Sequence, residues 1–116
     1  MTEQERRQAL RLKIPVLVEF LSPDTAKPER SFTRDLNAAG LRFPTAARFN
    51  IGQELAVTIE LNAQRSFRTT GEIIWIREIS RIGPVQYEVG MRFRWIEDPD
   101  RQRLNTFLLN SWQTEV

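Results

Sequence analysis

Alternation of apolar and polar residues, with a period of two, runs through most of the chain from residue 14 to residue 95. The clearest run is ELAVTIEL (54–61), in which every second residue is Leu, Val or Ile. A second run, VQYEVGMRFRW (85–95), places Met91, Phe93 and Trp95 on one face. This period is typical of β-strands that bury one face and expose the other.

Clusters of turn-forming residues, such as SPDTAKPE (22–29), separate these runs. Gly71 interrupts the longest run and predicts a bulge, a bend or a close approach of other backbone. After residue 97 the period changes to that of a helix, with Asp98 as its N-cap and Pro99 at its first helical position. The predicted strands cover 14–20, 30–36, 41–43, 54–61, 67–79 and 85–95.

The pattern predicts an all-β fold, a six-stranded antiparallel β-barrel with a C-terminal α-helix that packs across one open end or one flank. A β-sandwich is the alternative. The length of 116 residues fits one domain. We expect that domain to cover residues 14–116, after a flexible Arg-rich tail over residues 1–13.

The composition excludes several classes of site. The chain has no His and no Cys, which removes the usual zinc ligands, disulfides and imidazole bases. The hydroxyls of Ser66, Thr69 and Thr70 have no base partner in the sequence, so we expect no enzyme activity, no metal and no cofactor. A formal net charge of +2 and the lack of a long apolar run predict a cytoplasmic protein that neither binds DNA nor inserts into a membrane.

Arginine dominates the positive charge, with fifteen Arg against two Lys. Three of them, Arg6, Arg7 and Arg11, fall in ERRQALRLKIP (5–15), a segment with little to anchor it to a core. Arg forms paired hydrogen bonds to phosphate or to a guanine edge and stacks on flat rings. The arrangement therefore favours a tail that either keeps the chain soluble or closes over a planar anion.

The segment DLNAAG (35–40) has two interpretations. Asp, Asn and Gly are common turn formers, so it connects two strands. The carboxylate of Asp35 is also able to accept hydrogen bonds from the N1–H and the exocyclic amine of a guanine, while Arg donates to O6 and N7. Asn37 offers a polar side chain near Asp35, and Gly40 permits a ligand to approach the backbone.

Both segments together resemble the PilZ domain family. RQALR (7–11) fits the family's Arg-x-x-x-Arg motif, and DLNAAG fits Asp/Asn-x-Ser-x-x-Gly, except that Asn37 replaces the usual Ser. TTGEIIWI (69–76) and YEVGMRF (87–93) also resemble later strands of the family. The resemblance extends from about Arg6 to Leu109.

The resemblance implies a bacterial receptor module for cyclic di-GMP, without catalysis, that relays the signal to another protein or through self-association as a homodimer. The tail would wrap over the ligand, with Arg7 and Arg11 on guanine and phosphate, and Asp35 on the other guanine edge. An Arg at the position of Arg6 accompanies binding of two stacked ligands in this family. The expected ligand-binding residues are Arg6, Arg7, Arg11, Asp35, Asn37, Gly40 and Arg42.

Two other functions remain open at this level. The substitution of Asn37 for Ser also fits a PilZ-like protein-interaction module that binds no nucleotide. A small barrel that binds single-stranded nucleic acid would need exposed aromatics on a basic groove. The sequence instead predicts that Trp75, Phe93 and Trp95 face the core. It places Arg92 and Arg94 on an outward face, where they are solvated or, as the alternative, line the ligand groove.

Overall fold

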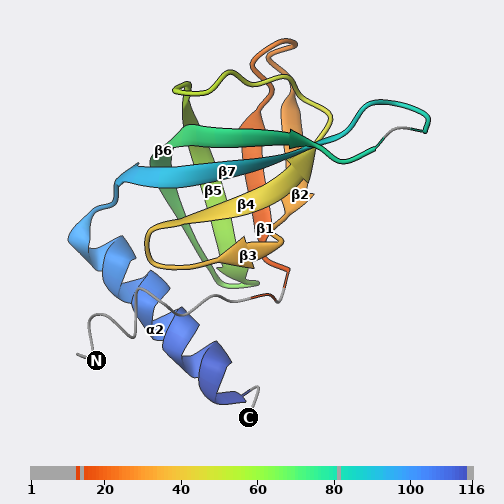
Figure 1. The fold of residues 1–116 in the computed structure, drawn as a ribbon. Helices are drawn as coiled ribbons and strands as arrows, with labels where there is room; N and C mark the ends of the chain where they lie inside the picture. Colours follow the sequence, from red (N-terminus) through yellow and green to blue (C-terminus); the bar gives the residue numbers. More distant parts are fainter. Residues whose placement is uncertain (1–12, 14, 81, 115–116) are drawn as a thin grey trace.

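A computed structural model describes residues 13, 15–80 and 82–114 of the chain. Over these residues, seven strands are followed by one helix (Figure 1). The elements are β1 (Leu17–Leu21), β2 (Pro28–Phe32), β3 (Asp35–Leu36), β4 (Gly40–Thr45), β5 (Glu54–Asn62), β6 (Arg65–Glu78), β7 (Tyr87–Trp95) and α2 (Asp98–Thr114). The predicted division into a tail and a domain stays a prediction, because residues 1–12 lie outside the described residues.

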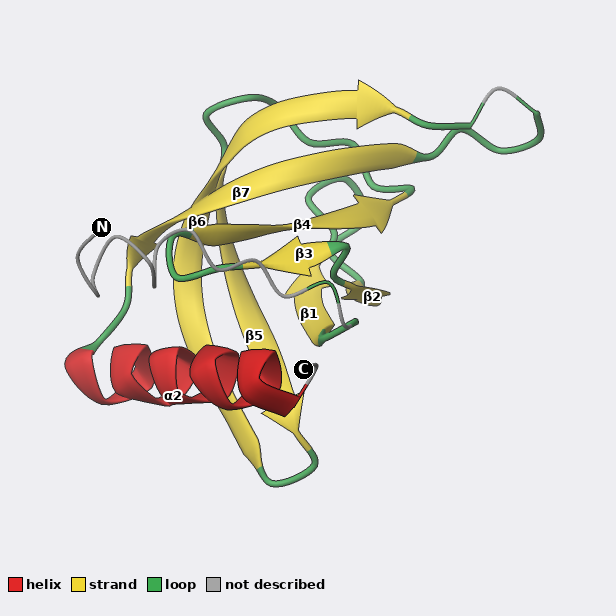
Figure 2. Ribbon diagram, turned by 60° about the horizontal axis from the view of Figure 1, so that its bottom comes forward, coloured by secondary structure: helices red, strands yellow, loops and turns green. Residues whose placement is uncertain are grey.

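All seven strands form one antiparallel sheet in the order β2-β1-β5-β6-β7-β4-β3. The sheet curls into a half-barrel, with β4 and β7 on one wall and β1 and β5 on the other (Figures 1 and 2). This confirms the predicted antiparallel barrel with a C-terminal helix. A single sheet also excludes the β-sandwich alternative.

The strand count differs from the prediction because the run 30–36 is two strands rather than one. The backbone N–H of Thr33 donates to Val16, at 2.9 Å, and its Oγ1 accepts from the Val16 N–H at 3.0 Å. The next residue, Arg34, donates its N–H to the carbonyl of Arg42, at 2.8 Å. The chain thus changes neighbours between residues 33 and 34, so β2 and β3 occupy opposite edges of the sheet and close the half-barrel.

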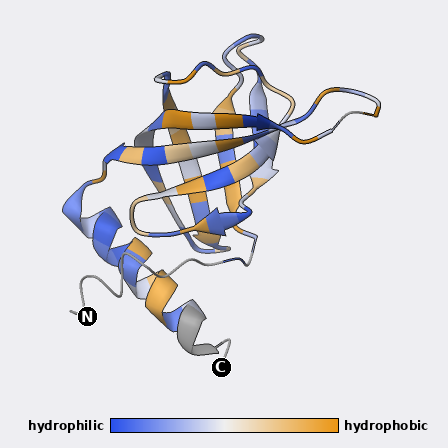
Figure 3. Cartoon of the chain, viewed as in Figure 1, coloured by the Kyte–Doolittle hydropathy of each residue, from blue (hydrophilic) through white to orange (hydrophobic). Residues whose placement is uncertain are grey.

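The core follows the alternation seen in the sequence. In β5, Leu55, Val57, Ile59 and Leu61 are buried, and apolar and polar bands alternate along the strands (Figure 3). Residues from every wall of the half-barrel join this cluster. Burial of apolar surface on this scale is the main stabilising contribution to such a fold.

Two register shifts between β6 and β7 change which of the aromatic side chains predicted to face the core actually do so. Trp75 pairs with Gly90 and Ile73 with Met91, so Ile74 is an extra residue in β6 and turns Trp75 to the outer face. A second shift at Thr70/Gly71 confirms the irregularity predicted at Gly71. Beyond it, Trp95 is 65% exposed, so its predicted place in the core is wrong. Phe93 does pack against the core.

Helix α2 lies across one end of the half-barrel (Figure 2). Among its residues whose burial is described, Leu104 and Leu108 are buried, which fits the helical spacing of the sequence. The first helical bond runs from the N–H of Arg101 to the carbonyl of Glu97, at 2.9 Å. Glu97 is therefore the cap residue, one position before the predicted Asp98.

Candidate functional site

The turn between β3 and β4 is fixed by its own side chains. Oδ1 of Asn37 accepts hydrogen bonds from the N–H groups of Ala39, at 2.8 Å, and Gly40, at 2.9 Å. The carbonyl of Ala39 accepts from the N–H of Phe93, at 2.8 Å, which ties the turn to β7. A Cβ at Gly40 would lie 2.1 Å from the carbonyl oxygen of Met91, so only glycine fits there.

Glycines and arginines alternate on the outer face of β4 and β7. Gly40 pairs with Arg92, and Arg42 pairs with Gly90. The space beside each glycine is already filled: the indole of Trp75 covers Gly90 so closely that a Cβ there would lie 2.2 Å from its Nε1. These glycines and arginines line a hollow of about 240 Å³ together with Trp75, Asp35 and Asn37.

Arg42 connects this hollow to two acidic residues. Its Nε lies 2.6 Å from Oδ2 of Asp35, and its Nη1 lies 3.2 Å from Oε1 of Glu88. The contact with Glu88 is a hydrogen bond. The contact with Asp35 is a close ion pair without hydrogen-bond alignment, because the buried Nε has no hydrogen-bond acceptor among the described residues.

A separate carboxylate holds the other arginine of the hollow. Oε1 of Glu72 accepts from Arg92 at 3.3 Å and from Arg94 at 2.5 Å. These hydrogen bonds, that of Arg94 first, lower the pKa of Glu72. The predicted solvation of Arg92 and Arg94 is therefore only partly correct: both are exposed, yet both are paired, and Arg92 lines the hollow.

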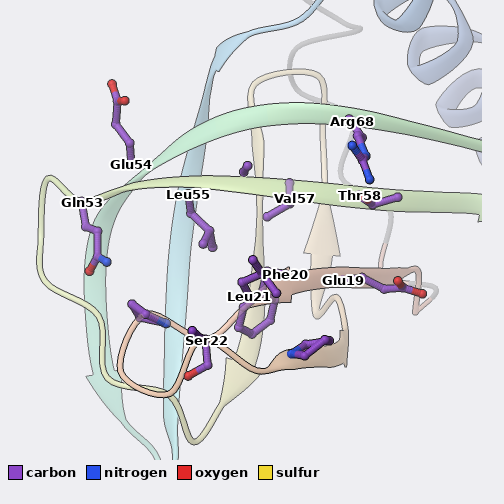
Figure 4. Close-up of a pocket in the computed structure, with 14 residues that line it drawn as sticks. Glu19, Phe20, Leu21, Ser22, Gln53, Glu54, Leu55, Val57, Thr58 and Arg68 are labelled. Carbon is purple, nitrogen blue, oxygen red and sulfur yellow. The ribbon is translucent and has the colours of Figure 1, made fainter.

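A larger hollow of about 580 Å³ lies on the opposite wall, between β5 and the β1–β2 hairpin (Figure 4). Its lining is mostly apolar, including Phe20, Leu21 and Leu55. The charged side chains in it are Glu19, Glu54 and Arg68. None of the described residues that line it is one that the sequence predicts to bind a ligand.

The PilZ domain family matches residues 5–110 of the sequence. This span includes the β3–β4 turn and both strands that carry the glycines and arginines. The chain belongs to the PilZ domain family. The resemblance read from the sequence is thereby confirmed.

Solved structures share this PilZ fold at low sequence identity. The PilZ domain with c-di-GMP of YcgR from Escherichia coli is 17% identical, with a TM-score of 0.74, over 95% of this chain and 94% of that chain. The Bacillus subtilis inhibitor of motility, MotI/DgrA, is 18% identical, with a TM-score of 0.77, over 96% of this chain and 53% of that chain. The K. pneumonia MrkH–c-di-GMP complex is 12% identical, with a TM-score of 0.75, over 90% of this chain and 52% of that chain.

The chain spans about half the length of MotI/DgrA and of MrkH. A search of curated proteins finds none that matches this sequence significantly.

Four of the predicted ligand-binding residues of this PilZ domain line the smaller hollow together: Asp35, Asn37, Gly40 and Arg42. Arg6, Arg7 and Arg11 lie outside the described residues. For all seven residues that the sequence predicts to bind the ligand, the role in binding stays a prediction.

Sequence reasoning missed the place of Trp75 and the partners of Glu88. The alternation puts Trp75 inside, and only the extra residue in β6 brings it out beside Gly90. Glu88 does lie on the predicted outer face, but arginines cover it. No signal in the sequence marks either feature, because both follow from how β4, β6 and β7 pair.

Within the described part of the chain, no three His, Cys, Asp or Glu residues form a group that holds a metal ion. Over the same residues, no helix combines the length and apolarity needed to cross a membrane.

Proposed function

We propose that this PilZ domain is a cyclic di-GMP receptor that binds the ligand in the hollow between Asp35, Arg42 and Arg92. The observation that carries the proposal is the pairing of Gly40 and Gly90 with these arginines beside a carboxylate. PilZ structures of YcgR and MrkH are described with c-di-GMP, which supports the same ligand class here.

The chemistry of the hollow matches a guanine and its phosphate. The Asp35 carboxylate accepts from the N1–H and the exocyclic amine of guanine, and an arginine donates to O6 and N7 or to phosphate oxygens. The exposed part of the Trp75 indole offers a flat surface to the purine. Asn37 keeps its amide nitrogen for a ligand, since its oxygen is used by the turn.

The Arg-rich segment supplies further donors in this proposal. Lys13 lines a third hollow, of about 510 Å³, together with Arg34, the residue that precedes Asp35 in the chain. Arg11 precedes Lys13 by two residues in the sequence, and the proposal has it reach the ligand from this edge of the sheet. Arg7 and Arg11 then close over the guanines and phosphates, and Arg6 completes a site for two stacked ligands.

Ordering of that segment is the signal in this proposal. Fixing its backbone opposes binding by about 1–2 kcal/mol per residue, and contacts to a doubly anionic ligand offset this cost. The ordered segment then presents a new surface to a partner protein in the bacterial cytoplasm, or to a second copy of the chain. The domain acts as a receptor rather than as an enzyme.

Calorimetric titration of the purified chain with cyclic di-GMP tests the proposal. We expect saturable binding with a micromolar or lower Kd, and a stoichiometry of two ligands per chain if Arg6 acts as stated. Cyclic di-AMP is the matched control, because adenine lacks the two donors that Asp35 requires. A flat titration with cyclic di-GMP would overturn the proposal and favour a protein-interaction module.

A further inference from the structure

Arg92 lies between a carboxylate and the smaller hollow. Strand β7 runs between β6 and β4 (Figure 1). Arg92 pairs with Glu72 on β6 and with Gly40 on β4, so these three residues form one row across the sheet. The Arg92 side chain is 57% exposed and lines the hollow, whereas Glu72 is not among the described residues that line it. The Arg92 guanidinium is therefore placed to turn either toward Glu72 or toward the hollow.

One oxygen of Glu72 is shared by two arginines. Its Oε1 accepts from Nη2 of Arg92 at 3.3 Å and from Nη1 of Arg94 at 2.5 Å. Hydrogen bonds between a guanidinium and a carboxylate are usually about 2.7–2.9 Å long, so the bond from Arg92 is a long one. Arg94 thus holds the carboxylate more closely, although Arg92 is the residue directly opposite Glu72 in the register.

Arg94 lies beside the hollow without lining it. It is not among the described residues of the lining, and it is the extra residue that β7 carries between Phe93 and Trp95. Such bulges re-aim side chains and are common next to functional sites. The Arg94 side chain is 50% exposed and donates to Glu72. Arg94 is therefore linked to the hollow through Glu72 and Arg92.

We infer that Arg94 is a positioning residue, which holds Glu72 and so leaves Arg92 free to turn to an anionic ligand in the smaller hollow. The inference rests on the proposed binding of cyclic di-GMP there. When a phosphate of the ligand accepts hydrogen bonds from Arg92, Glu72 loses its more distant partner and keeps the closer one. The carboxylate is then never left without a cation.

Without Arg94, Glu72 and the ligand would compete for Arg92. The ligand would have to break the hydrogen bond from Arg92 to Glu72 and leave that carboxylate without its remaining described partner. Binding should therefore weaken.

Two other roles for Arg94 also predict weaker binding when it is removed. Its positive charge could attract the anionic ligand from a distance, or its side chain could contact the ligand directly. Neither of these roles needs Glu72. The dependence of the effect on Glu72 therefore separates the positioning role from both.

The test is a double-mutant cycle measured by calorimetry with cyclic di-GMP on the full chain. We expect Arg94→Gln to raise Kd about fivefold, which is near the upper limit for an exposed charged pair. Glu72→Gln by itself should not raise Kd, because it removes the group that competes for Arg92. In the Glu72→Gln background, Arg94→Gln should change Kd by less than about twofold, since no carboxylate remains there to capture Arg92.

Arg30→Gln is the matched control. Arg30 is 71% exposed and pairs with Glu19 at 3.1 Å on the opposite wall, so the variant removes the same charge from the same kind of pair. It should leave Kd unchanged. Arg92→Gln should raise Kd at least as much as Arg94→Gln does, because Arg94 acts through Arg92. All of the substituted positions are partly or fully exposed, and thermal unfolding checks that each variant keeps the fold.

Several results would overturn the inference. These are an unchanged or lower Kd in Arg94→Gln, an increase that persists in the Glu72→Gln background, an equal increase in Arg30→Gln, or a smaller increase in Arg92→Gln than in Arg94→Gln. If the unmutated chain fails to bind cyclic di-GMP, the proposed function fails and the inference falls with it. If the unmutated chain binds and Arg94→Gln binds equally well, only the inference fails.

Discussion

The two hollows on opposite walls of the half-barrel differ in size and in chemistry. The hollow beside β1 and β5 holds about 580 Å³ and is mostly apolar, whereas the one on β4 and β7 holds about 240 Å³. Two carboxylates and one Arg line the larger one, and Glu19 there is paired with Arg30 at 3.1 Å. With Arg30 included, these charges balance, so the larger hollow offers an anionic dinucleotide no excess of positive charge.

The smaller hollow has the opposite character. Arg42 and Arg92 lie opposite Gly90 and Gly40, and Asp35 supplies the one carboxylate among the described residues that line it. The comparison indicates that the placement of donors, acceptors and missing side chains marks a nucleotide site better than volume does. Substitutions matched between the two walls test this directly.

The largest expected effect comes from the N-terminal arginines. Arg7→Ala or Arg11→Ala should abolish detectable binding of cyclic di-GMP, because each removes a guanidinium that donates paired hydrogen bonds to guanine or phosphate. The thermal midpoint should stay within about 2 °C, as is usual for surface substitutions. Calorimetry and thermal unfolding measure the two quantities.

Arg68→Ala, in the larger hollow, is the matched control for these arginines and should bind like the unmutated chain. A large fall in the midpoint of either tail variant would instead assign the tail a structural role. Loss of binding in Arg68→Ala would indicate that the ligand binds in the larger hollow, beside β1 and β5.

Asp35→Ala should weaken binding by a factor on the order of 100, since it leaves two guanine donors without an acceptor. Glu54→Ala removes a carboxylate from the larger hollow and should leave Kd unchanged. Titrations of both variants under the same conditions give the ratio. Equal losses in the two variants would contradict the assignment of the site to the β3–β4 turn.

Gly90→Ala should destabilise the chain by about 1–3 kcal/mol and weaken binding about tenfold, because the new methyl group displaces the Trp75 indole. Gly52→Ala is its control: φ is +89°, so the variant is strained, but nothing lies within 4 Å of the added Cβ. Chemical denaturation and calorimetry should show lower stability in both variants and weaker binding in Gly90→Ala alone.

The local part of the fold and of the site was predictable from the sequence. The alternation of apolar and polar residues and the clusters of turn-forming residues predict the strands of the sheet. The helix starts within one residue of its expected position. Asp35, Asn37, Gly40 and Arg42 lie within eight consecutive positions, so one turn brings them together without any knowledge of long-range pairing.

The long-range part was not predictable, because it depends on how strands pair. Ile74 continues the apolar run of β6 without a break, so the sequence does not mark it as the extra residue that turns Trp75 outward. Nor does it mark Thr33 as the point where the chain leaves β1 for β4. The partners of Glu88 come from two other strands and follow from the same register.

The smallest expected effect concerns the acidic range of pH. Hydrogen bonds from Arg94 and Arg92 lower the pKa of Glu72, near the smaller hollow. Near the larger hollow, the hydroxyl of Ser22 donates a hydrogen bond to Asp24, and this bond is the main cause that lowers the pKa of Asp24. A carboxylate with a lowered folded-state pKa adds stability above its unfolded pKa, about 4. That stability is lost as the pH falls through the folded-state value.

Glu72→Gln and Asp24→Asn should therefore each flatten the fall in thermal midpoint between pH 5 and pH 3, by a small amount because charge interactions at a protein surface contribute little. Thermal unfolding in that range measures it for each variant against the unmutated chain. If the effects are equal, charge pairing stabilises both walls alike, and the walls differ only in what they bind. A steeper fall in either variant would contradict the lowered pKa of that carboxyl.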